Sequence, residues 1–439
     1  MTILRTMRNF SSMNIAASIL LFVAAIAAAI IANSPVASVY QEFLLHELHL
    51  QIGNFNLLSH GGENLRMIEF INDGLMTIFF LLVGLEIKRE LLVGELSSFR
   101  KAALPFIAAC GGMLFPVIVY MSICPPGSAG SQGLAIPMAT DIAFSLGVLS
   151  LLGSRVPLSL KIFLTAFAVV DDIGGILVIA LFYSSHVSYG YILIAALLYV
   201  LLYFIGKRGT TNKIFFLVIG VVIWYLFLQS GIHSTISGVI LAFVIPAKPR
   251  LDVGKYIEHI RHTIAGFPVV ESGSIVLTNE QIAKLKEVES ASDRVISPLQ
   301  SLEDNLHGAV NYLILPLFAF VNAGVVFSGG GELVGSVGMA VAAGLLFGKF
   351  AGIYFFTWLA IKIKLTPMPP GMTWKNLSGI ALLGGIGFTV SLFIANLSFG
   401  ANYPVLLNQA KFGVLSGTIL SGLLGYIVLR IVLPVRKQK

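Results

Sequence analysis

The chain has 439 residues, of which 56% are hydrophobic and only 11% are charged, and its mean hydropathy is +0.90. Because a soluble domain carries about 25% charged residues, this composition excludes a soluble globular protein and indicates a polytopic membrane protein. The net charge of +7 would also suit a nucleic-acid-binding protein. The basic residues follow a membrane topology instead, so we expect a lipid bilayer around the chain and no nucleic-acid partner.

Apolar runs of about 20 residues, the length that a membrane-spanning helix needs, recur along the chain with short connections. The first run follows Arg5 and Arg8 and imitates a signal peptide, but at about 18 residues it is longer than a signal core. We therefore expect a retained first span. Twelve spans are predicted, near residues 14–33, 67–87, 102–123, 133–152, 158–183, 189–206, 214–228, 231–246, 307–327, 336–360, 377–398 and 405–430.

The basic residues test this span count, because cytoplasmic loops of membrane proteins are enriched in Lys and Arg. With both termini in the cytoplasm, all but three of the 28 Lys and Arg residues fall in cytoplasmic segments, the exceptions being Arg66, Lys349 and Lys411. A missing or extra span would place the basic residues of all later loops on the opposite side of the membrane. We predict one twelve-helix domain over residues 1–439 with both termini cytoplasmic.

An external loop is predicted at residues 34–66. Apolar and polar residues alternate between His49 and Leu57 on both sides of Gly53-Asn54, which is typical of a small β-hairpin. The edge of this hairpin could pair with a second copy of the chain and give a homodimer, or the loop could be a surface flap. The sequence leaves both alternatives open.

Residues 249–305 form the one long polar segment, which we interpret as a cytoplasmic insert. Within it, Leu277-Thr278-Asn279-Glu280-Gln281 has the pattern of a capping box preceded by a hydrophobic residue. This pattern predicts a charged helix that ends near Ala291. The insert is either regulatory or merely tolerated, and we do not expect it to contribute to a site within the membrane.

Two adjacent carboxylates, Asp171 and Asp172, lie in the middle of the apolar run 158–183. A charged residue at membrane depth costs from about 3 to more than 10 kcal/mol, so such residues predict a functional site. Neighbouring helical residues point about 100° apart, and the two carboxylates therefore face different surroundings. Lys349, in span 336–360, needs a carboxylate nearby, and Asp171 and Asp141 are the candidates. One Asp of the pair can face Lys349 while the other faces an ion path.

Two spans contain helix breakers at comparable depth. Pro137 precedes Thr140 and Asp141, and proline both removes a backbone donor and clashes with the preceding turn. We expect the helix to break there and to offer hard oxygen ligands to a small cation; the alternative is a simple proline kink. The glycines of the other span mark either close packing or an unwound segment. They are Gly384, Gly385 and Gly387.

Two interrupted helices in the two halves of a chain are typical of an inverted-repeat transporter with its site at the membrane midplane. Longer motifs follow the same order along the chain. They are Asn72-Asp73, Leu82-Val-Gly-Leu-Glu-Ile-Lys-Arg-Glu-Leu91, Ala135-Ile-Pro-Met-Ala-Thr-Asp-Ile-Ala-Phe144, Leu151-Leu-Gly-Ser-Arg-Val-Pro157, Asp171-Asp172, Ser230-Gly-Ile-His233, Leu315-Pro-Leu-Phe-Ala-Phe-Val-Asn-Ala-Gly324 and Gly384-Gly-Ile-Gly-Phe-Thr389. Together they resemble the NhaA family of bacterial sodium/proton antiporters, over nearly the whole chain apart from about residues 249–298.

The resemblance implies an all-α polytopic fold of twelve transmembrane helices with inverted repeats, in which spans four and eleven are interrupted and cross. It also implies a location in the bacterial inner membrane, no enzymatic activity and no cofactor. The implied activity is pH-regulated, electrogenic exchange, in which protons enter while Na⁺ or Li⁺ leaves.

Carried over by position, the resemblance makes Asp172 the principal carboxylate for the cation and the proton, with Thr140 and Asp141 beside it as ligands of the transported Na⁺. It pairs Asp171 with Lys349, and it lets Asp141 and Lys349 offset the dipoles of the facing half-helices. The residues that match the family's pH-responsive positions are Glu86, Lys88, Arg89, Glu90, His233, Glu303 and His307.

The chain also departs from the family's usual pattern. Phe350 stands where a proline commonly follows the lysine, and Asp304 and His307 stand where a histidine pair is common. The resemblance therefore does not transfer a pH set point.

The physical mechanism follows from the carboxylates themselves. A proton and a cation that compete for the same carboxylate oxygens, at a site exposed alternately to each side of the membrane, suffice for antiport.

An intramembrane aspartyl protease would carry Gly-x-Gly-Asp, but Asp141 follows Ala-Thr and Asp171 follows Val-Val. A rhomboid-type protease would need Gly-x-Ser-Gly, whose first glycine is missing from Thr235-Ile-Ser-Gly238. A Na⁺-coupled solute symporter of similar fold is the remaining alternative, disfavoured by a site of carboxylates without a solute cradle.

Overall fold

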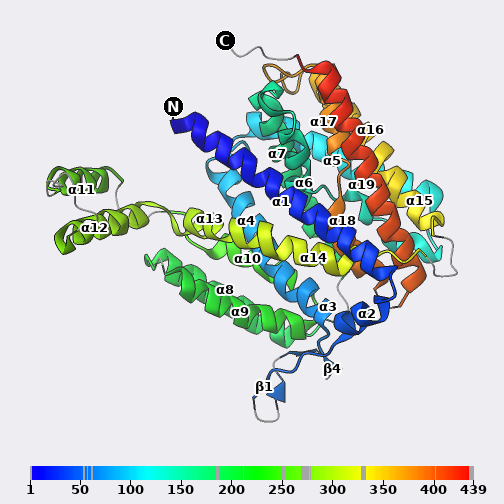
Figure 1. The fold of residues 1–439 in the computed structure, drawn as a ribbon, viewed down its shortest axis with the longest axis horizontal. Coiled ribbons are helices and arrows are strands. Elements are labelled where there is room, and N and C mark those ends of the chain that lie inside the picture. The colour runs from blue at the N-terminus through cyan, green and yellow to red at the C-terminus, as the bar shows by residue number, and fades with distance from the viewer. Residues whose placement is uncertain are drawn as a thin grey trace.

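The computed structural model describes residues 2–52, 55–56, 58–60, 63–183, 187–210, 212–248, 253–267, 276, 278–327, 333–400 and 402–434. It is a bundle of helices with short strand pairs at one end (Figure 1). The α-helices are α1 (Thr2–Ala32), α2 (Ala37–Leu45), α3 (Met67–Glu69), α4 (Met76–Leu92), α5 (Phe99–Ile123), α6 (Ile142–Ser150), α7 (Leu158–Phe182), α8 (Tyr189–Lys207), α9 (Lys213–Ser230), α10 (Thr235–Val244), α11 (Val253–Ala265), α12 (Asn279–Val295), α13 (Pro298–Ala309), α14 (Leu315–Asn322), α15 (Ser336–Ala343), α16 (Lys349–Lys362), α17 (Trp374–Leu383), α18 (Phe388–Phe399) and α19 (Pro404–Val432).

Shorter turns of 3-10 or π geometry join several of these helices. They are η1 (Phe70–Leu75), η2 (Ala129–Gly133), η3 (Ile136–Met138), η4 (Gly153–Arg155), η5 (Val310–Ile314) and η6 (Gly344–Gly348). The π turns η1, η5 and η6 sit inside otherwise continuous helices. Such π turns are frequent at functional sites.

Seven helices of the described chain are long and apolar enough to cross a membrane, and three bent helix pairs raise the number to at most ten. The all-helical, multi-pass membrane fold is therefore confirmed. The count of twelve and the inverted repeat stay predictions. The seven are Met67–Leu92, Phe99–Ile123, Leu158–Phe182, Tyr189–Lys207, Lys213–Ser230, Ser336–Lys362 and Pro404–Val432.

Both predicted interruptions are present. The segment Ala129–Met138 meets α6 at 47°, and α17 meets α18 at 44°. The first break follows Pro137, where Ala139 adopts an extended backbone with φ −77° and ψ 147°, as expected where proline ends regular helical pairing. The second break lies at residues 384–387, between α17 and α18.

Glycines allow α5 and α16 to pack closely along one another. A Cβ atom on Gly352 would collide with the carbonyl oxygen of Gly111, and one on Gly111 would collide with that of Gly352. Small residues at such contacts let two helix backbones approach. This contact fixes the position of α16, whose first residue is Lys349, beside the interrupted helices.

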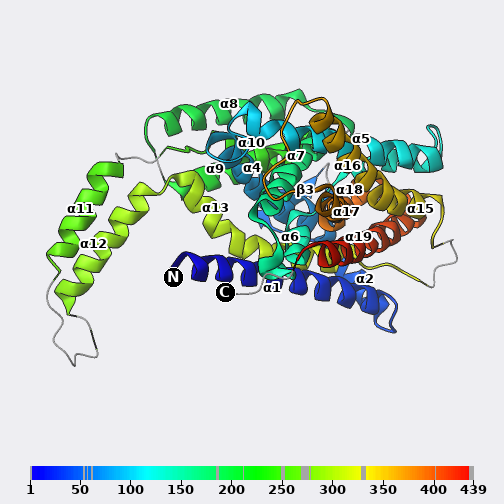
Figure 2. The ribbon, with the colours of Figure 1, turned by 90° about the horizontal axis from the view of Figure 1, so that it is seen from above.

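The polar segments lie outside the bundle. Helices α11 and α12 pair with one another and project away from the other helices (Figures 1 and 2). Thr278 and Gln281 exchange reciprocal hydrogen bonds at the start of α12, as in a capping box. The helix continues to Val295, beyond the predicted end at Ala291. Leu277 lies outside the described residues.

In the loop between α2 and α3, β1 (Gln51–Ile52) pairs antiparallel with β2 (Phe55–Asn56). A second pair joins β3 (Ser59–His60) and β4 (Glu63–Asn64). The turn residues of the predicted hairpin, Gly53-Asn54, lie outside the described part of the chain. The pairing of this hairpin with a second copy stays a prediction.

Candidate ion-binding site

The two helix interruptions contact each other through hydrogen bonds. The backbone N–H of Asp141 donates to the carbonyl oxygen of Ile386 at 2.6 Å. The hydroxyl of Thr140 donates to the carbonyl oxygen of Gly384 at 2.8 Å, and that of Ser145 donates to Leu383 at 3.0 Å. Each break therefore satisfies backbone groups that the other leaves without a helical partner, as irregular backbone within a membrane requires.

Gly385 allows the second break to pack closely against η6 and α19. A Cβ atom there would collide with the carbonyl oxygen of Leu345 and the hydroxyl of Ser421. We predict that Gly385→Ala lowers the free energy of unfolding by about 1–3 kcal/mol, because the backbone must move to make room for the methyl group. Gly190→Ala is the matched control, since its Cβ would meet nothing within 4 Å. Thermal unfolding in detergent measures the stability of both variants. Equal stability of the two would contradict the prediction.

Asp141 caps two helices at once. Its Oδ1 accepts the backbone N–H of Phe144 at 2.9 Å, at the start of α6. Its Oδ2 accepts both the backbone N–H and the hydroxyl of Thr389, at 3.1 and 2.7 Å, at the start of α18. A carboxylate at a helix N-terminus is stabilised by unpaired N–H groups and by the helix dipole. The carboxylate of Asp141 thus faces the dipoles of two half-helices.

Lys349 forms a fully buried ion pair. Its ammonium lies 2.6 Å from Oδ2 of Asp171, and both side chains have no exposed surface. It also donates to the hydroxyl oxygen of Thr140 at 2.9 Å, and it lies 5.6 Å from the ring centre of Phe167. Of the two carboxylates that the sequence allowed as its partner, Asp171 makes the pair.

Asp172 faces a cavity instead. A cavity of about 570 Å³ is lined at its inner end by Thr140, Asp141, Asp172 and Thr389, whereas Asp171 and Lys349 are not among its lining residues. The carboxylate of Asp172 makes no hydrogen bond or ion pair with the described residues. The two adjacent carboxylates therefore have different surroundings, as their helical spacing predicts.

The outer end of the same cavity holds charged residues of α4 and α13. Glu86, Arg89, Glu90 and His307 line it. Arg89 lies 2.9 Å from a carboxylate oxygen of Glu303 and 3.0 Å from one of Glu90. His307 lies 3.6 Å from Glu86 and 3.8 Å from Glu303. These five residues, which we call the outer cluster, come together from segments more than 200 residues apart.

The charges of the outer cluster influence one another. Burial raises the pKa of the Glu303 carboxyl, but His307 and the guanidinium of Arg89 outweigh burial and hold that pKa below its ordinary value. The protonation state of Glu303 therefore depends on the charges of its neighbours.

Lys88, which the resemblance placed with this cluster, and His233, which it linked only to pH response, lie elsewhere. The ammonium of Lys88 donates to the carbonyl oxygens of Phe243, at 2.7 Å, and Ile245 at the end of α10, where the helix dipole favours a cation. His233 lines other cavities together with Asp73, Arg66 and Glu69. The structure brings neither side chain into the outer cluster.

Sequence reasoning assigned no role to three asparagines whose side-chain amides are joined by hydrogen bonds. Asn322 donates to Asn72 at 2.8 Å, and Asn396 donates to Asn322 at 2.8 Å. Asp73 and Lys411 also line the cavity to which Asn72 and Asn396 contribute. The three asparagines could have been found in the sequence by the same feature as Asp172, which is a polar side chain within an apolar run.

An all-helical membrane bundle, whose interrupted helices meet beside buried carboxylates and a cavity, defines a secondary transporter. The model of the family described as "Na+/H+ antiporter 1" matches residues 8–429. The chain is 81% identical over 437 residues to the "Na(+)/H(+) antiporter NhaA" of Bacteroides fragilis, with 100% of both chains covered.

Relatives of the same name are more distant in two other organisms. The identity is 62% over 406 residues with the protein of Phocaeicola vulgatus, covering 92% of this chain and 91% of the relative. It is 51% over 449 residues with that of Parabacteroides distasonis, covering 99% and 98%. The chain belongs to the NhaA family of Na⁺/H⁺ antiporters, which are transporters of the bacterial inner membrane and not enzymes, and which need no cofactor.

Proposed function

We propose that this chain exports Na⁺ or Li⁺ in exchange for protons that compete for the carboxylate of Asp172. The observation that carries the proposal is the division between two adjacent carboxylates. Asp171 is held in a buried ion pair, whereas Asp172 lines the cavity without a partner among the described residues. A carboxylate that faces a cavity can accept either a proton or a small cation, but not both.

Thr140 and Asp141, which line the cavity beside Asp172, have different proposed roles in binding the ion. The hydroxyl of Thr140 donates to Gly384 and accepts from Lys349, so its remaining lone pair is available to a cation. Both oxygens of Asp141 accept hydrogen bonds from helix starts, which makes it a stabilising charge beside the ion. The cavity supplies a path from the outer cluster to Asp172.

The exchange is electrogenic in this proposal because more than one proton moves for each cation. Asp172 carries one proton, and the adjacent pair of Asp171 and Lys349 is a second titratable unit whose hydrogen bond the arriving cation would perturb. The charge moved is then unequal in the two directions.

Purified protein in proteoliposomes tests this function. With an imposed pH gradient, we expect addition of NaCl or LiCl to dissipate the gradient, while choline chloride does not. No organic solute is present, so a Na⁺-coupled symporter would give no response. Faster exchange after the membrane potential is collapsed with valinomycin and K⁺ would support electrogenic stoichiometry, and an unchanged rate would contradict it.

The outer cluster is the proposed pH sensor of this exchange. We predict that neutralising two of its members, in Glu86→Gln/Glu90→Gln, shifts the pH of half-maximal activity by about one unit, because coupled charges titrate together. Glu287→Gln, in the ion pair with Lys284 on the projecting helix α12, is the control. The measurement is the rate at which Na⁺ dissipates a pH gradient, between about pH 6 and 9. A pH–activity profile identical to that of the wild type would contradict the proposal.

We also propose that the outer cluster, the insert at residues 249–305 and both termini lie on the cytoplasmic side. The distribution of Lys and Arg supports this orientation. The paired strands β1 and β2 then lie outside, where their free edge could pair with that of a second copy.

A further inference from the structure

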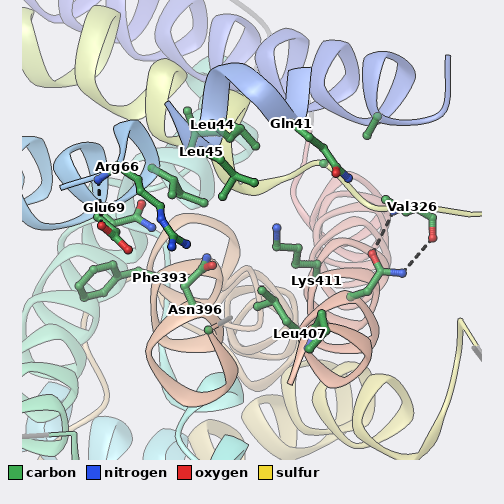
Figure 3. A pocket seen from close by; sticks show the side chains of 18 of the residues that line it. Gln41, Leu44, Leu45, Arg66, Glu69, Val326, Phe393, Asn396, Leu407 and Lys411 are labelled. Carbon is green, nitrogen blue, oxygen red and sulfur yellow. Dashed lines mark hydrogen bonds between the residues drawn. The ribbon is translucent and has the colours of Figure 1, made fainter. Parts of the chain in front are cut away.

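A second cavity, separate from the ion site, contains a buried lysine without a counter-charge. The cavity measures about 830 Å³ and lies between α2, α18, α19 and the segment before α3. Lys411 of α19 is only 9% exposed. Its ammonium makes neither an ion pair nor a hydrogen bond with the described part of the chain, and Figure 3 shows it directed into the open space. A buried charge of this kind calls for an anionic partner.

The other charges of this cavity lie on its far side. In Figure 3 Arg66 and Glu69 lie together, across the cavity from Lys411. The carboxylate of Glu69 accepts the backbone N–H of Arg66 at 2.9 Å, and Asp73 lines the same region. Both carboxylates thus lie on the side of Arg66, where the three residues also line a neighbouring cavity, and neither forms an ion pair with Lys411. The single ammonium at the wall of α19 suits a monoanion better than a dianion.

The walls of the cavity are apolar at their rim. Leu45 and Val405 line it and are each 53% exposed. Leu44, Phe393 and Leu407 line it deeper (Figure 3). The amides of Gln41 and Asn396 add uncharged polar groups to this lining. A volume of this size lies within the range of about 300–1,000 Å³ that small-molecule sites occupy.

The wall made by α2 is fixed before any ligand arrives. The hydroxyl of Tyr40 donates to the carbonyl oxygen of Phe320 at 2.6 Å. Asn33, at the bend between α1 and α2, donates to Val325 at 2.6 Å and accepts the N–H of Phe327 at 2.7 Å. A preformed wall reduces the entropy that a ligand must lose on binding.

We propose that this cavity binds an anionic phospholipid, with the phosphodiester beside Lys411 and the apolar part against Leu45 and Val405. A phosphodiester carries a single negative charge, and the surrounding bilayer supplies an apolar tail next to it. The proposal assigns a binding site outside the Asp172 cavity and does not rest on the exchange mechanism.

Delipidated protein in detergent tests the site, by native mass spectrometry and thermal unfolding with added phosphatidylglycerol, phosphatidylcholine or inorganic phosphate. We expect phosphatidylglycerol to bind and raise Tm, and the other two to do neither. Lys411→Met should weaken phosphatidylglycerol binding about fivefold, and Lys411→Arg should retain it. Arg66→Gln, on the other wall, is a second variant that should weaken binding less.

Lys375→Met, at an exposed lysine of α17, is the matched control for general attraction of anionic lipid to basic residues and should bind like the wild type. Unchanged binding by Lys411→Met would overturn the proposal, as would an equal loss in the control. If phosphatidylcholine bound as tightly as phosphatidylglycerol, the site would not select an anionic lipid, and the proposal would be wrong. An equal Tm shift with inorganic phosphate would show a site for free anions instead of lipid.

Discussion

Asp172→Asn is expected to abolish Na⁺-driven proton movement in proteoliposomes, to the level of liposomes without protein. The amide has the size of the carboxylate but can neither bind a proton in this pH range nor offer a negative charge to Na⁺. Because the carboxylate of Asp172 makes no hydrogen bond or ion pair with the described residues, its replacement by an amide removes no polar contact. Expression and Tm should therefore remain close to those of the wild type.

The matched control is Glu42→Gln, which removes an exposed carboxylate of α2 that lines neither large cavity. We expect this variant to exchange Na⁺ for protons at the wild-type rate. If the Asp172→Asn variant exchanged Na⁺ for protons at the wild-type rate, Asp172 would not be a ligand of the transported ion. A large fall in its Tm would show instead that the carboxylate supports the fold.

The second large effect concerns the ion pair of Lys349 and Asp171. We expect Lys349→Met to lower the free energy of unfolding by about 3–5 kcal/mol, because it leaves the carboxylate of Asp171 buried and unpaired. The double variant Lys349→Met/Asp171→Asn should regain most of this loss, since neither side chain then carries a charge. The difference between the single and double variants measures the coupling of the pair.

Thermal or denaturant unfolding in detergent, followed by tryptophan fluorescence, compares these variants. Lys362→Met is the control, because the exposed Lys362 lies over the ring of Trp358 at 4.3 Å and should contribute only about 0.5–1 kcal/mol. A Lys349→Met protein as stable as the wild type would contradict the prediction. So would a double variant no more stable than the single one.

Properties that depend on neighbours along the chain could be predicted from the sequence. Hydropathy indicated the apolar helices because each must match the thickness of a bilayer. Pro137 and the glycines near Gly385 indicated the two helix breaks, because they act on their own backbone. The cost of a charge at membrane depth singled out Asp171, Asp172 and Lys349. The membrane class and the interruptions therefore needed no tertiary structure, and the same reasoning named the candidate site residues, whose roles stay predictions.

Only the tertiary structure decided how these residues meet. The pairing of Lys349 with Asp171 depends on where the packing of α16 against α5 places the lysine. The capping of both α6 and α18 by Asp141 likewise needs the two breaks to touch. Lys88 lies outside the outer cluster for the same reason. Contacts between segments far apart in the chain arise from side-chain packing, which no local pattern of residues encodes.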